Sequence, residues 1–150
     1  MTPEPEAFER LRTLFEADPM AIGLGVRLIE LGEGSAVVEG TITEQHVNFL
    51  GGGHGGMLFS LADIAMSFAS NSFGRIAPAL RVDISYMAPV AAGSVARATA
   101  TTPKVTRRFG HHQLDVTVDG TLVAQATGTT YRTDDWHFGR DAWPEDWPHR

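Results

Sequence analysis

The stretch Asn48–Asn71, NFLGGGHGGMLFSLADIAMSFASN, decides the fold of this chain. Its first part is rich in glycine, and its second part is an apolar run that begins at Met57. The apolar residues of this run fall on every side of a helical repeat, which predicts a helix that is buried all round. As far as Ala69, only Ser60, Ser67 and Asp63 interrupt it. Because an ionised carboxylate is costly to bury without a partner, Asp63 is a candidate functional residue.

The glycines in front of this helix predict a site for negative charge. Gly55 and Gly56 have no side chains to cover the first N–H groups, which lack partners inside the helix. The helix dipole places partial positive charge at the same point. The pattern favours a site for an anion, or for an oxygen that becomes negative during a reaction. A flexible loop leading into a core helix is the alternative.

Composition narrows the class of protein. The chain has 150 residues, 43% hydrophobic and 20% charged, which is ordinary for one globular domain. Its net charge of −6 argues against a nucleic-acid partner, and the absence of cysteine excludes disulfides, a thiol nucleophile and a cysteine-ligated metal. The acidic start of the chain lacks the apolar core of a signal peptide, and no run reaches the roughly 18 apolar residues of a membrane span. We expect a cytoplasmic protein without a membrane partner.

The chain before the glycines predicts a helix and a hairpin. Residues 5–17 have an amphipathic helical pattern. Asp18-Pro19 resembles an N-cap followed by proline at the first position of a short second turn. Val26–Leu31 and Ser35–Thr43 have strand character around a turn. The central helix follows and is expected to end near Gly74.

After Pro78 the period of the sequence changes to two, which predicts strands. We expect four strands in an antiparallel meander, with the hairpin signal Asp119-Gly120 between the last two. Small residues at alternate positions would let the sheet approach a thick helix: Ala96, Ala98, Ala100, Ala124, Ala126 and Gly128. The predicted fold class is α+β, an antiparallel sheet wrapped around a long central helix.

The tail, residues 133–150, contains all three tryptophans of the chain. Its composition fits no regular element. We expect it to lie over the outer surface or at an oligomer contact, with the indoles as anchors. A lid over a ligand is the alternative.

The motif His46-x-Asn48-x-x-Gly51-x-x-His54-Gly55-Gly56, followed by Leu61-Ala62-Asp63, closely resembles the hotdog-fold thioesterases of the phenylacetic-acid-degradation (PaaI-type) group. Further matches are Ser85-Tyr86-Met87-x-Pro89, Gly93 and the hairpin that ends in Thr130-Tyr131-Arg132. The resemblance covers roughly residues 18–133. It implies a hotdog fold, and we interpret residues 1–150 as a single hotdog thioesterase domain.

The resemblance also implies hydrolysis of an acyl-CoA thioester to a free acid and CoA, without a cofactor or a metal ion. The substrate would be an aryl-acetyl-CoA or a similar medium-sized acyl-CoA. Asp63 matches the catalytic carboxylate, and Gly55 matches the amide that polarises the thioester carbonyl. Asn48 matches the side chain that helps to hold the attacking water or the carboxylate, and His54 matches a position that supports the helix start.

Four residues are candidate substrate contacts: Gly56, Ser67, Arg107 and Arg108. Arg107 and Arg108, with the nearby Lys104, would meet the CoA phosphates at the mouth of the site. A solvated turn is the alternative for this basic cluster.

The spacing within the central helix predicts a dimer. Gly55 and Asp63 are eight residues apart, so they are separated by about 12 Å along one helix. Asp63 can act on a carbonyl held at Gly55 only if the two residues belong to different copies with antiparallel helices. We expect a homodimer with shared active sites, arranged as a dimer of dimers.

Other chemistries fit the sequence less well. The glycine loop lacks the lysine of a phosphate-binding P-loop, and His111 and His112 point to opposite faces of a strand and cannot chelate one metal. A hydratase or dehydratase of the same fold would need a catalytic histidine paired with an acid, whereas His54 sits at the helix start. A non-catalytic acyl-CoA-binding or regulatory hotdog module remains the other alternative, although such a module would be expected to lack Asp63.

Overall fold

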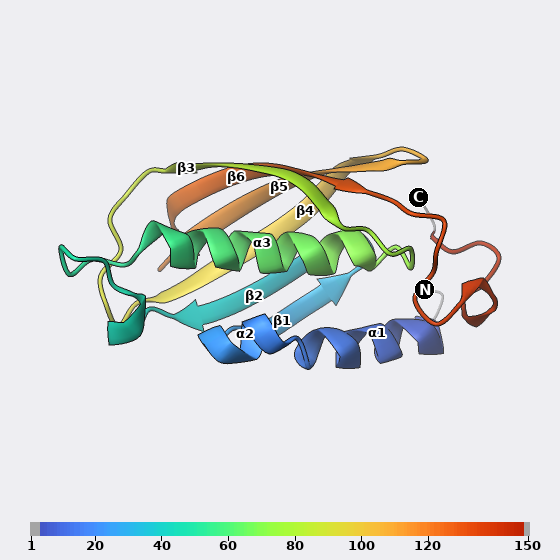
Figure 1. The fold of residues 1–150 in the computed structure, drawn as a ribbon, viewed down its shortest axis with the longest axis horizontal. Helices are drawn as coiled ribbons and strands as arrows, with labels where there is room; N and C mark the ends of the chain where they lie inside the picture. Colours follow the sequence, from blue (N-terminus) through green and yellow to red (C-terminus); the bar gives the residue numbers. More distant parts are fainter. Residues whose placement is uncertain (1–3, 149–150) are drawn as a thin grey trace.

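A computed structural model describes residues 4–148. The ends of the predicted domain and tail, residues 1–3 and 149–150, lie outside this range. One antiparallel sheet of six strands curls around the long helix α3, as predicted (Figure 1). The helices are α1 (Glu6–Glu16), α2 (Pro19–Leu24) and α3 (Gly55–Asn71), with short 3-10 helices η1 (Glu44–His46) and η2 (Arg140–Ala142). The strands are β1 (Arg27–Gly32), β2 (Ser35–Thr41), β3 (Ala79–Tyr86), β4 (Val95–Val105), β5 (Phe109–Val118) and β6 (Thr121–Tyr131).

The N-terminal elements follow the sequence pattern closely. Asp18 caps α2, since its carboxylate accepts a hydrogen bond from the Ala21 N–H at 2.8 Å. α1 buries its apolar face, and the ring of Phe15 stacks on Phe68 of α3 with centroids 4.5 Å apart. The hairpin of β1 and β2 begins and ends within two residues of the prediction. α1 therefore covers part of the side of α3 that the sheet leaves open.

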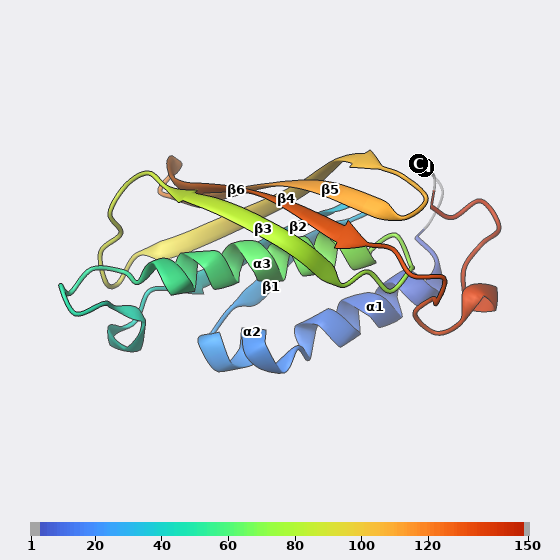
Figure 2. The same ribbon diagram turned by 45° about the horizontal axis from the view of Figure 1, so that its top comes forward.

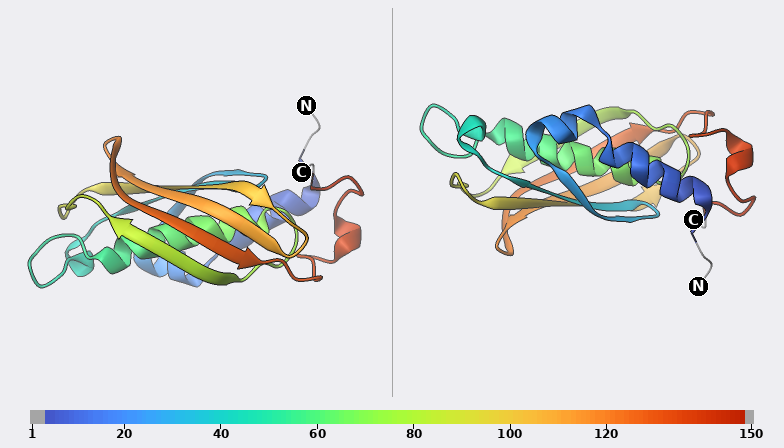
Figure 3. Two further views of the ribbon diagram at one scale, coloured as in Figure 1. Left: turned by 90° about the horizontal axis from the view of Figure 1, so that it is seen from above. Right: turned by 90° about the horizontal axis from the view of Figure 1, so that it is seen from below.

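The predicted four-strand meander is wrong for β3. The strand order is β1-β2-β4-β5-β6-β3, so β4, β5 and β6 form a meander while β3 pairs with β6 at the opposite edge (Figure 3). β4 is paired with β2 on one side and with β5 on the other, which leaves no place beside it for β3. The turn at Asp119 and Gly120 has φ values of 48° and 78°, as a tight hairpin requires.

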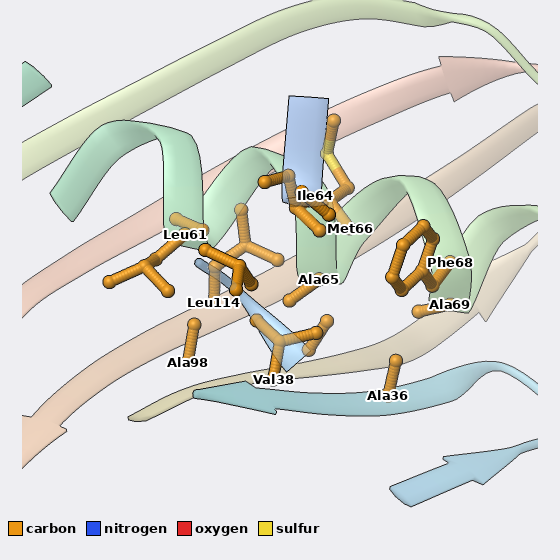
Figure 4. Close-up of a cluster of buried hydrophobic side chains, with 14 of the residues drawn as sticks. Ala36, Val38, Leu61, Ile64, Ala65, Met66, Phe68, Ala69, Ala98 and Leu114 are labelled. Carbon is orange, nitrogen blue, oxygen red and sulfur yellow. The ribbon is translucent and has the colours of Figure 1, made fainter. Parts of the chain in front are cut away.

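α3 packs closely on the sheet because small residues face it. The alanines of β4 and β6 named above are buried against the helix, and a Cβ atom at Gly128 would collide with the sulfur of Met66. Figure 4 shows this layer, in which Leu61 and Ala65 of α3 face Ala98 and Leu114 of the sheet. A larger residue at position 128 would therefore require the buried Met66 side chain to move.

The prediction that α3 is buried all round is also wrong. A stripe along the helix is exposed or only half-buried, and it contains Gly56, Ser60, Asp63 and Ser67. The sheet and α1 cover the rest of the helix, and this stripe carries most of its polar side chains and its one charge. The stripe follows the helical repeat, and Asp63 lies within it.

The tail closes one end of the core. Trp143 and Trp147 are buried to 4% and 5% exposure, and Trp147 meets the ring of Phe8 edge-on with centroids 5.6 Å apart. Trp143 and Trp147 are anchors, as predicted, but they lie in the core instead of on the outer surface, and Trp136 packs against this core partly buried. Apart from η2 the tail is irregular. In Figure 2 the tail lies beside the end of α3, whereas the glycine loop lies at the opposite end of the molecule.

Candidate active site

The glycine loop before α3 is held by backbone hydrogen bonds. The Gly53 N–H donates to the Val90 carbonyl oxygen at 2.7 Å, and the His54 N–H donates to the His46 carbonyl oxygen at 2.7 Å. A Cβ atom at Gly53 would lie 3.0 Å from that same Val90 oxygen, so a larger residue would force the segments apart. The loop therefore holds the first turn of α3 in a fixed position.

His54 is the N-cap of α3. Its Nδ1 atom accepts a hydrogen bond from the Gly56 N–H at 2.8 Å, which is the supporting position that the resemblance implies. This bond occupies the N–H of Gly56, a predicted substrate contact. The Gly55 N–H has no acceptor among residues 4–148. It is the donor that the first turn leaves open, at the positive end of the helix dipole.

A cleft of about 450 Å³ opens beside Gly55. It is lined by Gly53, Gly55, Leu58 and residues 86–90. The ring of Tyr86 stands over Gly55, since a Cβ atom there would lie 3.0 Å from the ring. The open N–H of Gly55 thus lies next to space that can hold a small molecule.

Asp63 lies on the open stripe of α3 and is half-buried. Its carboxylate has no hydrogen bond or ion pair among the described residues, and burial raises the pKa of the carboxyl above its usual range. A structural acid would be held by backbone or serine donors, and Asp63 is not. A carboxylate with this combination of partial burial and free oxygen atoms is suited to proton transfer or nucleophilic attack.

Asp63 lines a second, smaller cleft of about 190 Å³. Its walls are Asp63, Met66, Ser67, Asn71, residues 76–79 and Thr130. Ser67, a predicted substrate contact, lies in this wall. Gly55 and Asp63 therefore line different clefts of one chain, as their separation along α3 requires.

Asn48 organises the loop in front of α3. Its Oδ1 atom accepts hydrogen bonds from the Leu50 N–H at 2.9 Å and the Gly52 N–H at 3.3 Å. Its Nδ2 group donates to no acceptor in the described part of the chain. The loop holds Leu50 and Phe49 with 80% and 96% of their surface exposed, so two apolar side chains project from the molecule beside the site.

Comparison with known proteins gives the family. The sequence profile of the thioesterase superfamily matches residues 50–125. The chain is 36% identical over 111 residues to acyl-coenzyme A thioesterase PaaI of Escherichia coli, a match that covers 74% of this chain and 79% of the relative. The chain is a hotdog-fold thioesterase of the PaaI type. This PaaI-type thioesterase superposes on the E. coli PaaI structure with a TM-score of 0.82 and 34% identity, over 87% of this chain and 95% of the other.

Two further relatives of the PaaI-type thioesterase bear on its substrate. Human acyl-coenzyme A thioesterase 13 is 30% identical over 110 residues, which cover 71% of this chain and 79% of the relative. A Streptococcus mutans protein solved with bound acetyl CoA is similar in structure, with a TM-score of 0.70 and 25% identity over 72% of this chain and 88% of the other. The chain is thus an acyl-CoA thioesterase in class.

None of the described helices of the thioesterase has the length and apolar character needed to cross a membrane.

The two arginines of this thioesterase that are predicted to meet CoA lie in the turn between β4 and β5. Arg108 donates to both carboxylate oxygens of Asp134, at 3.0 and 2.9 Å, so its guanidinium is already engaged. This pairing lowers the pKa of the Asp134 carboxyl. The Arg107 side chain makes no ion pair within residues 4–148. The assignment of both residues to the CoA phosphates stays a prediction.

Several residues beside the candidate catalytic groups of the PaaI-type site were not singled out by the sequence. Asn71 and Thr130 line the Asp63 cleft, and Tyr86 lines the Gly55 cleft. Tyr86 was part of the family motif but had no assigned role. Asn71 carried a usable signal, since it is a polar residue in the last turn of an apolar helix. Thr130 was also part of the family match, but its place in the Asp63 cleft could not be inferred because it depends on the pairing of β6 with β3.

Proposed function

We propose that this thioesterase hydrolyses an aryl-acetyl-CoA, or a similar medium-sized acyl-CoA, to the free acid and CoA. The observation that carries this proposal is that α3 presents two groups suited to the reaction. One is the half-buried Asp63 carboxylate, which has no hydrogen-bond partner among the described residues, and the other is the open N–H of Gly55. The aryl-acetyl preference is supported by E. coli PaaI, which is described as a protein of the phenylacetic acid degradation operon.

The active site is composed across a homodimer, and two dimers assemble into a tetramer. Asp63 of one copy acts on a thioester that is held by Gly55 of the partner subunit, because about 12 Å of helix separates the two residues within one chain. The open stripe of α3, the exposed edge of β3 and the projecting Phe49 and Leu50 give a surface that a second copy would cover.

Each group has a defined chemical role in this mechanism. The Gly55 N–H donates to the thioester oxygen and stabilises the negative charge that develops on it. The ionised Asp63 either removes a proton from a water that attacks the carbonyl carbon, or attacks that carbon itself to form an anhydride that water then opens. In both routes the C–S bond breaks and the thiol of CoA leaves with a proton. The Asn48 amide donates to the water or to the carboxylate.

The remaining predicted contacts position the substrate. Ser67 lies one helical turn from Asp63 in the wall of its cleft. Gly56 keeps the helix start free of side chains. Arg107, and Arg108 if it exchanges Asp134 for a phosphate, supply positive charge for the CoA phosphates.

The first experiment measures release of free thiol from a panel of acyl-CoAs, from acetyl- to octanoyl-CoA together with phenylacetyl-CoA. We expect hydrolysis, with a preference for phenylacetyl-CoA or for a medium-chain acyl-CoA. Tight binding of acyl-CoA without any release of thiol would identify a binding module and would contradict the proposed activity. Preference for acetyl-CoA would overturn the substrate class alone.

A second experiment tests the shared site. Asp63→Asn and Asn48→Ala, each nearly inactive, are unfolded and refolded together in equal amounts. Random pairing makes roughly half of the dimers mixed, each with one intact site of two, so activity should recover to about a quarter of wild type. The control is a mixture of the variants refolded separately. Recovery no greater than this control, with subunit exchange verified by mass, would place both residues in one chain's site.

A further inference from the structure

Backbone hydrogen bonds join the tail to the loop between α3 and β3, and this loop forms one wall of the Asp63 cleft. The Thr133 N–H donates to the Ile76 carbonyl oxygen at 3.0 Å, and the Ile76 N–H donates to the Asp135 carbonyl oxygen at 2.9 Å. The His137 N–H donates to the Gly74 carbonyl oxygen at 2.9 Å. The loop between α3 and β3 therefore runs along the tail as a short antiparallel ribbon.

Asn71 joins this ribbon to α3. Its Oδ1 atom accepts from the Ala77 N–H at 2.9 Å and lies 2.8 Å from Nε2 of His137, while its Nδ2 group donates to the Ser67 and Ala77 carbonyl oxygens at 2.9 and 3.1 Å. The Ala77 N–H requires an oxygen, which fixes the orientation of the amide. His137 therefore holds its proton on Nε2 and donates it to Asn71. Burial lowers the pKa of His137, which keeps the ring neutral.

The tail itself is fixed to the core. The Trp143 Nε1 group donates to the His137 carbonyl oxygen at 2.8 Å, and the guanidinium of Arg10 lies over the Phe138 ring at 4.0 Å. A side chain at Gly74 would collide with Trp136, so the loop and the tail fit without a gap. His137 is thus held through its carbonyl oxygen by the buried indole of Trp143 and through its ring by Asn71 in the last turn of α3.

The cleft that this assembly supports suits an acyl group. Met66 and residues 76–79 supply apolar walls beside polar groups of Ser67, Asn71 and Thr130, and no lysine or arginine lines the cleft. CoA phosphates would find no positive charge there, whereas an acyl chain attached to a carbonyl at Asp63 would find apolar surface. Its volume of about 190 Å³ limits the size of that group.

We propose that the tail, residues 133–148, sets the acyl-chain selectivity of the Asp63 cleft, with His137 as the positioning residue. This inference depends on the proposed function, because it takes Asp63 as the reacting group. The thioesterase profile ends at residue 125, so the tail lies outside the part of the chain that the family profile describes. The tail holds Asn71 and the 76–79 wall in place, and so it fixes the depth of the cleft.

The test compares His137→Ala with His137→Gln, whose amide can donate a hydrogen bond at a similar reach, and with His111→Ala, a control on the exposed face of β5. kcat and KM are measured separately over the acyl-CoA series. A defined apolar pocket discriminates between chains by roughly tenfold or more, and His137→Ala should lose about that factor of preference through a change in KM. His137→Gln should retain most of it, and the control should match wild type.

Thr133→Val is a milder variant in case His137→Ala does not fold. It removes the hydrogen bond from Thr133 Oγ1 to the Ile76 carbonyl oxygen, which measures 2.8 Å at an exposed site. Binding of non-hydrolysable thioether analogues of the same acyl-CoAs gives the selectivity without turnover. An absence of wild-type turnover would overturn the proposed function. Unchanged chain preference in folded His137→Ala and Thr133→Val, by turnover or by analogue binding, would overturn the role of the tail.

Discussion

The start of α3 is held mainly by backbone groups, whereas its end is held by side chains. At the start, the His54 imidazole is the one side chain that caps the helix, and it leaves the Gly55 N–H open. At the end, both the oxygen and the nitrogen of the Asn71 amide are hydrogen-bonded. The Ser72 hydroxyl accepts a hydrogen bond from the Gly34 N–H at 2.7 Å and donates one to the Ala69 carbonyl oxygen at 2.7 Å. The Gly55 N–H is open because no side chain caps it. The fully bonded end gives the helix a fixed base from which Asp63 projects.

Replacing Asp63, which lies between the two ends of α3, should have the largest effect on turnover. Asp63→Asn keeps the shape of the side chain but removes the base, which typically costs about 10²–10⁴-fold in rate. We expect kcat to fall by that factor, while substrate binding and the unfolding midpoint stay close to wild type. Asp119→Asn, in an exposed turn that tolerates asparagine, is the matched control. Turnover within a few-fold of wild type would show that Asp63 is not the reacting group.

The pH profile of the wild type gives an independent check on Asp63. Burial raises the pKa of this carboxyl. Because the ionised form is the active one, kcat/KM should fall with decreasing pH already above the usual range of an aspartate, near 4. An acidic limb at or below that range would argue against the partly desolvated carboxylate described above.

The open donor at the helix start is tested by Gly55→Pro. Proline is tolerated in the first turn of a helix, but it removes the N–H that is proposed to bind the oxyanion. Loss of such a donor costs about 10²–10³-fold in kcat. Gly55→Ala is the matched control, because it places the same Cβ atom against Tyr86 and keeps the N–H. If the two variants turn over equally well, the amide has no part in the reaction.

The fixed end of α3 should loosen first in acid. His112 is buried between Thr102 and Thr130, each 2.9 Å from one ring nitrogen, and Thr102 also donates to Gly34, whose N–H binds Ser72. Burial lowers the pKa of His112 from 6.5 to about 4. In the unfolded chain His112 therefore binds a proton below pH 6.5, whereas in the folded chain it binds one only below about pH 4. Stability should fall over this window by roughly 3 kcal/mol.

Urea unfolding between pH 7 and 4 measures this loss, with His112→Gln as the variant that cannot titrate. The free energy of unfolding of the wild type should fall more steeply with acid than that of the variant. Hydrogen exchange at Ser72 should quicken before exchange at Met57 in the first turn. Parallel curves for the two proteins would mean that His112 is not the responsible group.

The smallest expected effect compares the two ends directly. Asn71→Ala leaves the buried N–H of Ala77 without its acceptor and should cost about 2–3 kcal/mol of unfolding free energy. His54→Ala removes one exposed cap and should cost about 1 kcal/mol. The difference is measured by denaturant unfolding of both variants under one set of conditions. Equal losses would mean that the side chains at the end of α3 contribute no more than the single cap at its start.

Local signals in the sequence predicted most of the fold. Asp18 and the Asp119-Gly120 turn act through near neighbours, and the alanines alternate with the period of a strand, so their roles could be inferred from spacing alone. The position of β3 could not, because alternation shows which face a residue takes but not which strand lies beside it. Within the site, the separation of Gly55 from Asp63 followed from helix geometry. The bond between His137 and Asn71 joins residues 66 positions apart and has no local signature.

The order of the strands in the sheet has a consequence for synthesis on the ribosome. β3 ends at Tyr86, but its only partner strand in the described structure, β6, does not begin until Thr121, which is 35 residues later. At about 5–20 residues per second, the nascent chain carries β3 unpaired for some seconds. During that time its backbone edge and its exposed Leu80 and Tyr86 are open to other chains. Chains that stop before residue 121 should therefore aggregate more readily than the full chain, through the unpaired β3.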